Sequence, residues 1–195
     1  MKEKLSMILF VLVLGSMLTV ALVVAHDYTA PIIERNQALK IKTKVLEAFD
    51  IAHTKDDVET VFSRNIETTE KEDRMFYISR NREIAFEISG SGLWGPIHGV
   101  IAMMPDLETI KGITIIHQEE TPGLGGRIAE KAYLDKFKNK KIFPELKILP
   151  PGKVRKENEV DAITGATLSC KAFEKILNSQ LKEYLSLFRS VHSGS

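Results

Sequence analysis

An uninterrupted apolar stretch near the N-terminus constrains this chain more than any other feature. No charged residue occurs from Leu5 to Ala25, where Leu, Val, Ile, Met, Phe and Ala dominate. About twenty such residues allow a helix to cross the hydrocarbon core of a bilayer. The run therefore predicts a membrane-spanning helix. The alternative is a cleaved signal peptide with Lys2 and Lys4 in its basic part, but the run exceeds the usual apolar core of such peptides, which favours a retained anchor.

Composition limits the kind of partner that the protein has. The 195 residues include 27 basic and 26 acidic side chains, and a net charge of +1 leaves no electrostatic footprint for nucleic acid. The only cysteine, Cys170, excludes an internal disulfide framework and a cysteine-based metal site. The length allows about one ordinary domain beside the anchor. We expect an anchor at residues 1–30, one domain at residues 31–189 and a flexible tail at residues 190–195.

Two helical segments are expected between the apolar run and the first strand. Residues 35–49 place apolar side chains on one side and lysines on the other. This pattern predicts an amphipathic helix beside the membrane, with its lysines toward solvent or lipid headgroups. Thr54 followed by Asp57 resembles a capping box with Asp in place of Glu, and it predicts a short helix through Phe62.

From Arg74 onward, apolar residues recur with the period of two that is typical of half-buried strands. We expect a hairpin of strands 75–78 and 84–88, a glycine-rich break at 89–92, strands at 97–103, 112–117 and 146–149, and a helix over 128–137. These elements predict a single α+β domain in which an antiparallel sheet is flanked by helices.

A strongly periodic helix is expected at the end of this domain. Apolar residues at 168, 172, 173, 176, 177, 181, 184 and 185 follow the three-and-four spacing of an amphipathic helix. The stretch Asp161–Cys170 is expected in its first turn, where free N–H groups and the helix dipole favour a phosphate. The residues alone leave an ordinary N-cap at Thr164 as the alternative.

The order of residues in this stretch resembles the flavinylation motif of the FMN-binding domain family. The matching positions are Asp161, Thr164, Gly165, Ala166, Thr167 and Ser169. In that family a flavin transferase esterifies the phosphate of FMN to the Thr after Gly-Ala. The resemblance implies covalent FMN on Thr167, with Leu168 beside the flavin and Asp161 as the acidic residue that the transferase needs.

A second segment, residues 118–126, contains three glycines beside Pro122. On its own it indicates a tight loop, and it lacks the Gly-Lys-Ser/Thr ending of a phosphate-binding loop. Its Glu-Thr-Pro-Gly-Leu-Gly sequence is similar to the other signature of the same family, which forms part of the flavin pocket. The resemblance implies that the flavin is approached by Glu120, Thr121, Pro122, Gly123, Leu124 and Gly125.

The only tryptophan, Trp94, stands in Gly-Leu-Trp-Gly, which is a third match to the family. Its ring either fills the core beside the hairpin or lies over the flavin plane. The histidines at 53, 98 and 117 are scattered along the sequence and form no catalytic dyad or metal-ligand pattern. We therefore expect no catalytic group and no metal site.

The family includes the flavin-carrying subunits of Rnf complexes and of sodium-pumping NADH:quinone oxidoreductase. The resemblance implies an electron-transfer subunit, not an enzyme by itself, whose FMN connects other subunits of a membrane complex. Basic residues on both sides of the span leave its orientation undecided by charge. The resemblance places a single-pass protein in the cytoplasmic membrane of a prokaryote, with the domain on the outer face. Two other functions stay open: a membrane-tethered assembly module without redox role, and an extracytoplasmic flavoprotein that serves another reductase.

Overall fold

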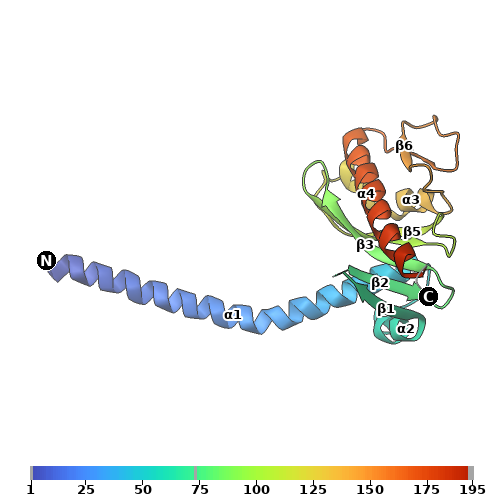
Figure 1. The fold of residues 1–195 in the computed structure, drawn as a ribbon. Helices are drawn as coiled ribbons and strands as arrows, with labels where there is room; N and C mark the ends of the chain where they lie inside the picture. The colour runs from blue at the N-terminus through green and yellow to red at the C-terminus, as the bar shows by residue number, and fades with distance from the viewer. Residues whose placement is uncertain (1, 73, 193–195) are drawn as a thin grey trace. The chain divides into compact units, whose positions relative to one another are not determined.

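A computed structural model describes residues 2–72 and 74–192 (Figure 1). The chain divides into two compact units after Lys40. Helix α1 (Lys2–Ala48) continues through Pro31, so the two helices expected on either side of that proline are one helix. Of the expected tail, residues 190–192 extend the C-terminal helix, and residues 193–195 lie outside the described part of the chain.

The first unit consists of the apolar part of α1. Its large side chains from Leu5 to Val24 are exposed, and none of the 18 residues in its apolar window is buried. Among the described residues, α1 is the one helix long and apolar enough to cross a membrane, although a signal sequence near the N-terminus meets the same criteria. The apolar stretch therefore forms the helix that its composition predicts.

The second unit is organised around a five-stranded antiparallel sheet whose strands neighbour one another in chain order. Its strands are β1 (Ile66–Lys71), β2 (Arg74–Ser79), β3 (Ile84–Ser91), β4 (Pro96–Met103) and β5 (Ile110–Gln118). The expected hairpin is confirmed, because Phe76 pairs with Phe86 and Ile78 with Ile84. The sheet is a meander, which confirms the predicted α+β class.

One face of this sheet packs against the C-terminal helix α4 (Thr167–His192) (Figure 1). Phe86, Ile101 and Ile113 pair across three strands, so their side chains point to the same face. They belong to one buried cluster with the apolar side of α4. Gly90 lies directly beneath Ile176, where a Cβ would overlap the isoleucine side chain.

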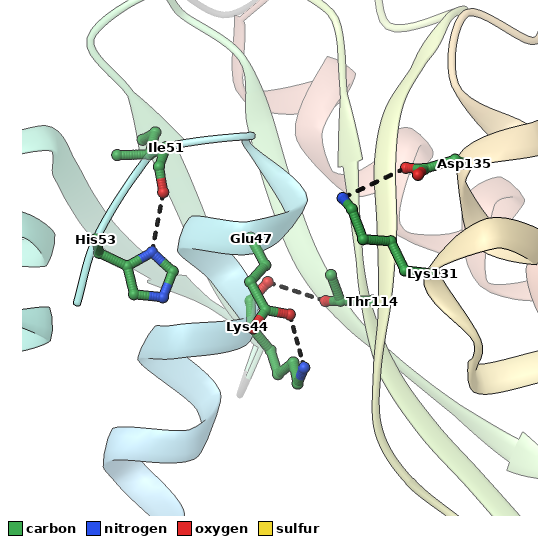
Figure 2. A network of polar contacts seen from close by, with 7 residues as sticks. All are labelled: Lys44, Glu47, Ile51, His53, Thr114, Lys131 and Asp135. Carbon is green, nitrogen blue, oxygen red and sulfur yellow. Dashed lines mark hydrogen bonds and ion pairs between the residues drawn. The ribbon is translucent and has the colours of Figure 1, made fainter. Parts of the chain in front are cut away.

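The opposite face carries the end of α1 and the short helix α2 (Val58–Asn65). The Thr114 hydroxyl of β5 donates a 2.9 Å hydrogen bond to the carbonyl oxygen of Lys44 in α1 (Figure 2). Tyr77 of β2 meets the ring of Phe62 in α2 edge to face, with the ring centres 6.1 Å apart. The second unit therefore has three layers, with helices on both sides of the sheet.

Short elements connect β5 to α4. They are the 3₁₀ turn η1 (Gly125–Ala129), helix α3 (Lys131–Leu134), the 3₁₀ turn η2 (Asp135–Phe137) and strands β6 (Lys147–Leu149) and β7 (Glu159–Asp161). The predicted continuous helix over 128–137 is wrong, because Glu130 has an extended backbone (φ −69°, ψ 131°) that ends η1 before α3 begins. Strands β6 and β7 pair in parallel and form a small second sheet, of which only β6 was expected.

Two further expectations need correction. Residues 89–91 do not break the sheet, because Ser89, Gly90 and Ser91 continue β3 and pair with β4. The short helix opened by Thr54 starts later than predicted, at Val58. Thr54 N–H does donate to Asp57 Oδ1 at 2.7 Å, which is one half of a capping box, but the residues between them form a turn.

Candidate functional site

The buried carboxylate of Glu120 brings the three sequence motifs together. Glu120 lies two residues after the end of β5, and it is only 3% exposed. Oε1 accepts N–H hydrogen bonds from Leu93 at 2.6 Å and from Trp94 at 3.1 Å. Oε2 accepts the Ser169 hydroxyl of α4 at 2.5 Å. Three segments that lie far apart in the sequence therefore meet at one side chain.

Glycine is required on both sides of this carboxylate. A Cβ at Gly92 would overlap Glu120 Oε1, and a Cβ at Gly125 would overlap Ser169 Oγ and lie 2.7 Å from Glu120 Oε2. The loop that carries Glu120 is closed by the Thr121 carbonyl, which accepts the N–H groups of Leu124 and Gly126. Thr121, Pro122 and Gly123 lie exposed at the tip of this loop.

The predicted attachment motif forms a strand, a turn and a helix start. The expectation that all of it lies in the first turn of the helix is wrong, because Asp161 ends β7 and residues 162–166 form the turn. Gly165 has a φ of +83°, a left-handed conformation that a side chain would strain. Ala166 is buried, and the exposed Thr167 begins α4. This geometry presents the Thr167 hydroxyl to solvent at the positive end of a helix.

Exposed apolar side chains cluster in the same three motifs. Trp94 is 72% exposed and Leu168 63%, so the alternative in which Trp94 fills the core is excluded. Leu93 and Leu124 are also exposed, and Leu124 lies beside Gly165, at 3.4 Å from the position of a Cβ there. Large apolar groups left in water indicate a surface that another molecule covers.

A cavity of about 290 Å³ opens beside the motif. Asp161, Ala162, Ile163 and Thr164 line one side of it, and Arg127 and Lys136 contribute two cations. Sequence reasoning missed both cations, because Arg127 falls between the expected loop over 118–126 and the expected helix over 128–137, and Lys136 falls within that helix. Asp161 Oδ1 accepts the N–H of Gly152 at 3.0 Å, which holds the carboxylate at the edge of this cavity.

A second cavity, of about 580 Å³, is lined by the end of α1, by β5 and by the segment 129–138, and it contains none of the motif residues. Its charged groups pair with one another, as in the bonds of Lys44 with Glu47 and of Lys131 with Asp135 (Figure 2). The candidate site is therefore the surface around Glu120 and Thr167.

Cys170 is buried in the first turn of α4, where it contacts the turn that precedes the helix. Its thiol is 1% exposed, and Sγ accepts the N–H of Ile163 at 3.3 Å. The Tyr133 hydroxyl lies 3.6 Å from the same sulfur. Burial raises the pKa of Tyr133 above its ordinary range, so this phenol stays protonated. Cys170 is thus a small, buried side chain of the core.

The histidines at 53, 98 and 117 each make one local polar contact. His98 lies 2.8 Å from Glu87, His117 lies 3.1 Å from Glu119, and His53 Nδ1 lies 2.9 Å from the carbonyl of Ile51. The hydrogen bond from His98 and a second one from Tyr77 lower the pKa of Glu87, although burial opposes them. Within the described residues, no group of three potential metal ligands occurs.

Comparison with models of known protein families finds a match over the segment that carries the site. Residues 92–182 match the model of the FMN-binding domain family. The matched segment begins at Gly92 and contains Glu120 and Thr167, so it includes all three motifs. The resemblance to the FMN-binding domain family that the three motifs indicated is therefore confirmed over this part of the chain.

Two related proteins share one name. Over 97 residues, 47% of this chain, the sequence is 39% identical to the C subunit of Na(+)-translocating NADH-quinone reductase of Neisseria meningitidis. Over 102 residues, 50% of this chain, it is 35% identical to the protein of the same name from Haemophilus ducreyi. The matched segments span 38% and 40% of the length of those relatives.

Two crystal structures share the fold. The C subunit of Na(+)-translocating NADH-quinone reductase from Parabacteroides distasonis aligns with a TM-score of 0.73 at 24% identity, covering 80% of this chain and 94% of that one. NqrC of Shewanella oneidensis aligns with a TM-score of 0.63 at 18% identity, covering 73% and 96%. At these identities the likeness establishes the fold alone.

The residues at the site fit a flavin joined through its phosphate. Thr167 supplies an exposed hydroxyl, and the small residues Gly165 and Ala166 leave the backbone open before it. The free N–H groups of a helix start favour phosphate oxygens. Trp94, Leu124 and Leu168 supply exposed apolar surface for a flat ring system. FMN bound here would supply one-electron chemistry, and the chain would supply its position and surroundings.

Proposed function

We propose that this protein is a membrane-anchored electron-transfer subunit that carries FMN covalently on Thr167 in a complex of the Na(+)-translocating NADH-quinone reductase type. The observation that carries the proposal is the convergence of the three motifs on Glu120, with the Thr167 hydroxyl exposed beside them. The names of the related proteins favour this type of complex over an Rnf complex.

The arrangement explains why a separate transferase is needed. A threonine hydroxyl is a weak nucleophile until a base activates it. Thr167 stands exposed at the start of α4, and the nearby carboxylate of Glu120 is occupied by Ser169 and two N–H groups. The flavin transferase therefore supplies the activation, and Asp161 at the edge of the neighbouring cavity is the acidic group offered to it.

Helix α1 and the exposed apolar surface around Thr167 indicate where the protein acts. Helix α1 holds the domain at the cytoplasmic membrane as a single span, with the domain on the outer face. The exposed apolar side chains around Thr167 support a flavin at the surface of the domain, from which other subunits of the complex can exchange electrons with it. In this arrangement, the flavin connects two redox centres without a diffusing substrate.

The test is the fluorescence of the denatured full-length protein in a gel, after production in cells that contain the flavin transferase. We expect a fluorescent band for the natural protein and none for Thr167→Ala. Thr60→Ala is the matched control, since Thr60 is also exposed on a helix but lies outside the motifs. A dark natural protein, or a fluorescent Thr167→Ala variant, would contradict the proposal.

The same variants separate this function from an assembly module. An assembly module requires α1 and the docking surface but not the hydroxyl of Thr167. If the Thr167→Ala variant kept full redox turnover in isolated membranes, while removal of residues 1–40 abolished the complex, the assembly role would replace the redox role.

A further inference from the structure

Both carboxylate oxygens of Glu120 accept hydrogen bonds from other groups of the protein. Oε1 accepts the N–H groups of Leu93 and Trp94, and Oε2 accepts the hydroxyl of Ser169. The side chain is 3% exposed, so it forms no part of the surface that a flavin would touch. Glu120 therefore acts on the site through the groups that it holds.

These groups lie on the two sides of the candidate site. Leu93 and Trp94 form the loop that follows β3, and this loop is closed by the hydrogen bond from Gly92 N–H to the Gly95 carbonyl at 2.8 Å. Ser169 lies two residues after Thr167 in the first turn of α4. The carboxylate thus fixes the distance between the exposed Trp94 loop and the helix start that carries the acceptor hydroxyl.

The partners of the Glu120 carboxylate are two backbone N–H groups and a hydroxyl, which are dipoles and carry no net charge. Among the ion pairs formed by the described residues, none includes Glu120, whereas neighbouring Glu119 pairs with His117 at 3.1 Å. A negative charge in a buried position acts on its surroundings more strongly than an exposed one, because water screens it less. A buried carboxylate near a redox group opposes the addition of electrons to that group.

We propose that Glu120 is a positioning residue that ties the Trp94 loop to the start of α4, and that its buried negative charge lowers the reduction potential of the flavin on Thr167. The first part concerns the protein without flavin. The second part rests on the proposed function, because it requires a flavin on Thr167.

Two substitutions separate the geometry from the charge. Glu120→Gln keeps an oxygen that can accept the two N–H groups, and its amide can donate to the Ser169 hydroxyl, so the geometry is retained and the charge is lost. Glu120→Ala loses both. The matched control is Glu119→Gln, which removes a carboxylate one residue away whose side chain is 56% exposed.

Trp94 reports on the geometry without any flavin, because it is the only tryptophan. In full-length protein made without the transferase, we expect Glu120→Ala to lower the fluorescence anisotropy of Trp94, because its loop loses the two N–H hydrogen bonds to the carboxylate. Glu120→Gln and Glu119→Gln are expected to resemble the natural protein. Unchanged anisotropy in Glu120→Ala would overturn the positioning role, whether or not Thr167 carries flavin.

Redox titration of the full-length flavinylated protein in detergent tests the effect of the charge. We expect Glu120→Gln to keep flavin on Thr167 with a more positive midpoint potential, and Glu119→Gln to keep the natural potential. An unchanged potential in Glu120→Gln would overturn the electrostatic role. A natural protein without flavin would instead refute the proposed function, while the tryptophan measurements would still decide the positioning role.

Discussion

The rings of Phe86 in β3 and Tyr184 in α4 are stacked, with centroids 4.4 Å apart and planes only 9° from parallel. The guanidinium of Arg74 lies over the Tyr184 ring at 4.6 Å and pairs with Glu183. Tyr184 is thus held between a core ring of the sheet and a cation near its edge. This contact fixes the C-terminal half of the helix whose first turn carries Thr167.

Loss of this stack should loosen α4. We expect Tyr184→Ala to lower the free energy of unfolding by about 2 kcal/mol, because both the buried area and the aromatic pair are lost. Tyr184→Phe keeps the ring and should change the stability by less than about 0.5 kcal/mol. Urea unfolding followed by circular dichroism measures both variants, and equal losses would mean that the hydroxyl, not the ring, makes the contact.

Gly125 should not tolerate a side chain. We expect Gly125→Ala to cost about 1–3 kcal/mol, the usual range for overpacking, because its Cβ would overlap Ser169 Oγ and lie 2.7 Å from Glu120 Oε2. Gly126→Ala is the control, since its Cβ would come no closer than 3.3 Å to any atom, there meeting the end of the Gln118 side chain and the Thr121 carbonyl oxygen. A double variant, Gly125→Ala with Ser169→Ala, should cost less than the sum of the single changes in the same unfolding assay.

Cys170 offers a single-site probe of the helix start. Its thiol is 1% exposed, so we expect a maleimide to react with the natural protein only as the first turn of α4 opens. Adding denaturant should raise the labelling rate by orders of magnitude. Rapid labelling of the native protein, followed by mass spectrometry, would show that this turn is open in solution.

The pair of Glu87 and His98 should make the stability depend on pH. The hydrogen bond from His98 lowers the pKa of Glu87 below its ordinary value of 4.5, so its stabilising contribution is present above about pH 4.5 and is lost as the pH falls through the lowered pKa. We expect His98→Leu to cost about 1 kcal/mol near neutral pH. That difference should shrink on acidification.

Urea unfolding at several pH values measures this effect. His117→Leu is the control, because His117 and Glu119 are more than half exposed and their pair should add little. A loss in His98→Leu that stays constant down to the acid limit would show that packing, not the charge of Glu87, is responsible.

The bond between Thr114 and Lys44 should hold the end of α1 on the sheet. Thr114→Val replaces the hydroxyl with a methyl group of similar size, and we expect a loss of about 1 kcal/mol because the Lys44 carbonyl loses its donor. Thr114→Ser keeps the donor and should restore most of this loss. Hydrogen exchange of residues 45–48 would localise the change to the end of α1.

The helices and strands with a clear local pattern of apolar residues were predicted from the sequence. The apolar runs of β3 and β4 reflect burial on both faces of the sheet, and the three-and-four spacing of α4 reflects the one side that this helix buries. Strand β1 escaped prediction because it lies at the edge of the sheet and four of its six residues are exposed, so it has no apolar alternation. Strand β7 escaped because its one apolar residue, Val160, stands between Glu159 and Asp161.

The candidate site was predictable in its parts but not in its arrangement. Resemblance to a family marked Thr167, Glu120 and Trp94 as members of one site. No spacing rule could show that Glu120 binds Ser169, 49 residues further along, or that Trp94 stays in solvent. Arg127 and Lys136 were missed because their position beside Asp161 depends on how the short segments η1, α3 and η2 pack, which no local pattern encodes.

The meander order of the sheet also sets a sequence of events during synthesis. Strands β1 to β5 pair with their neighbours in chain order, so the sheet can form while the ribosome is still extending the chain. Glu120, in contrast, must wait for Ser169 before its carboxylate is satisfied. If Thr167 is modified as we propose, the modification is therefore a late step in biogenesis, which follows release of α4 and closure of the domain, and a nascent chain stalled before residue 169 should present no substrate to a transferase.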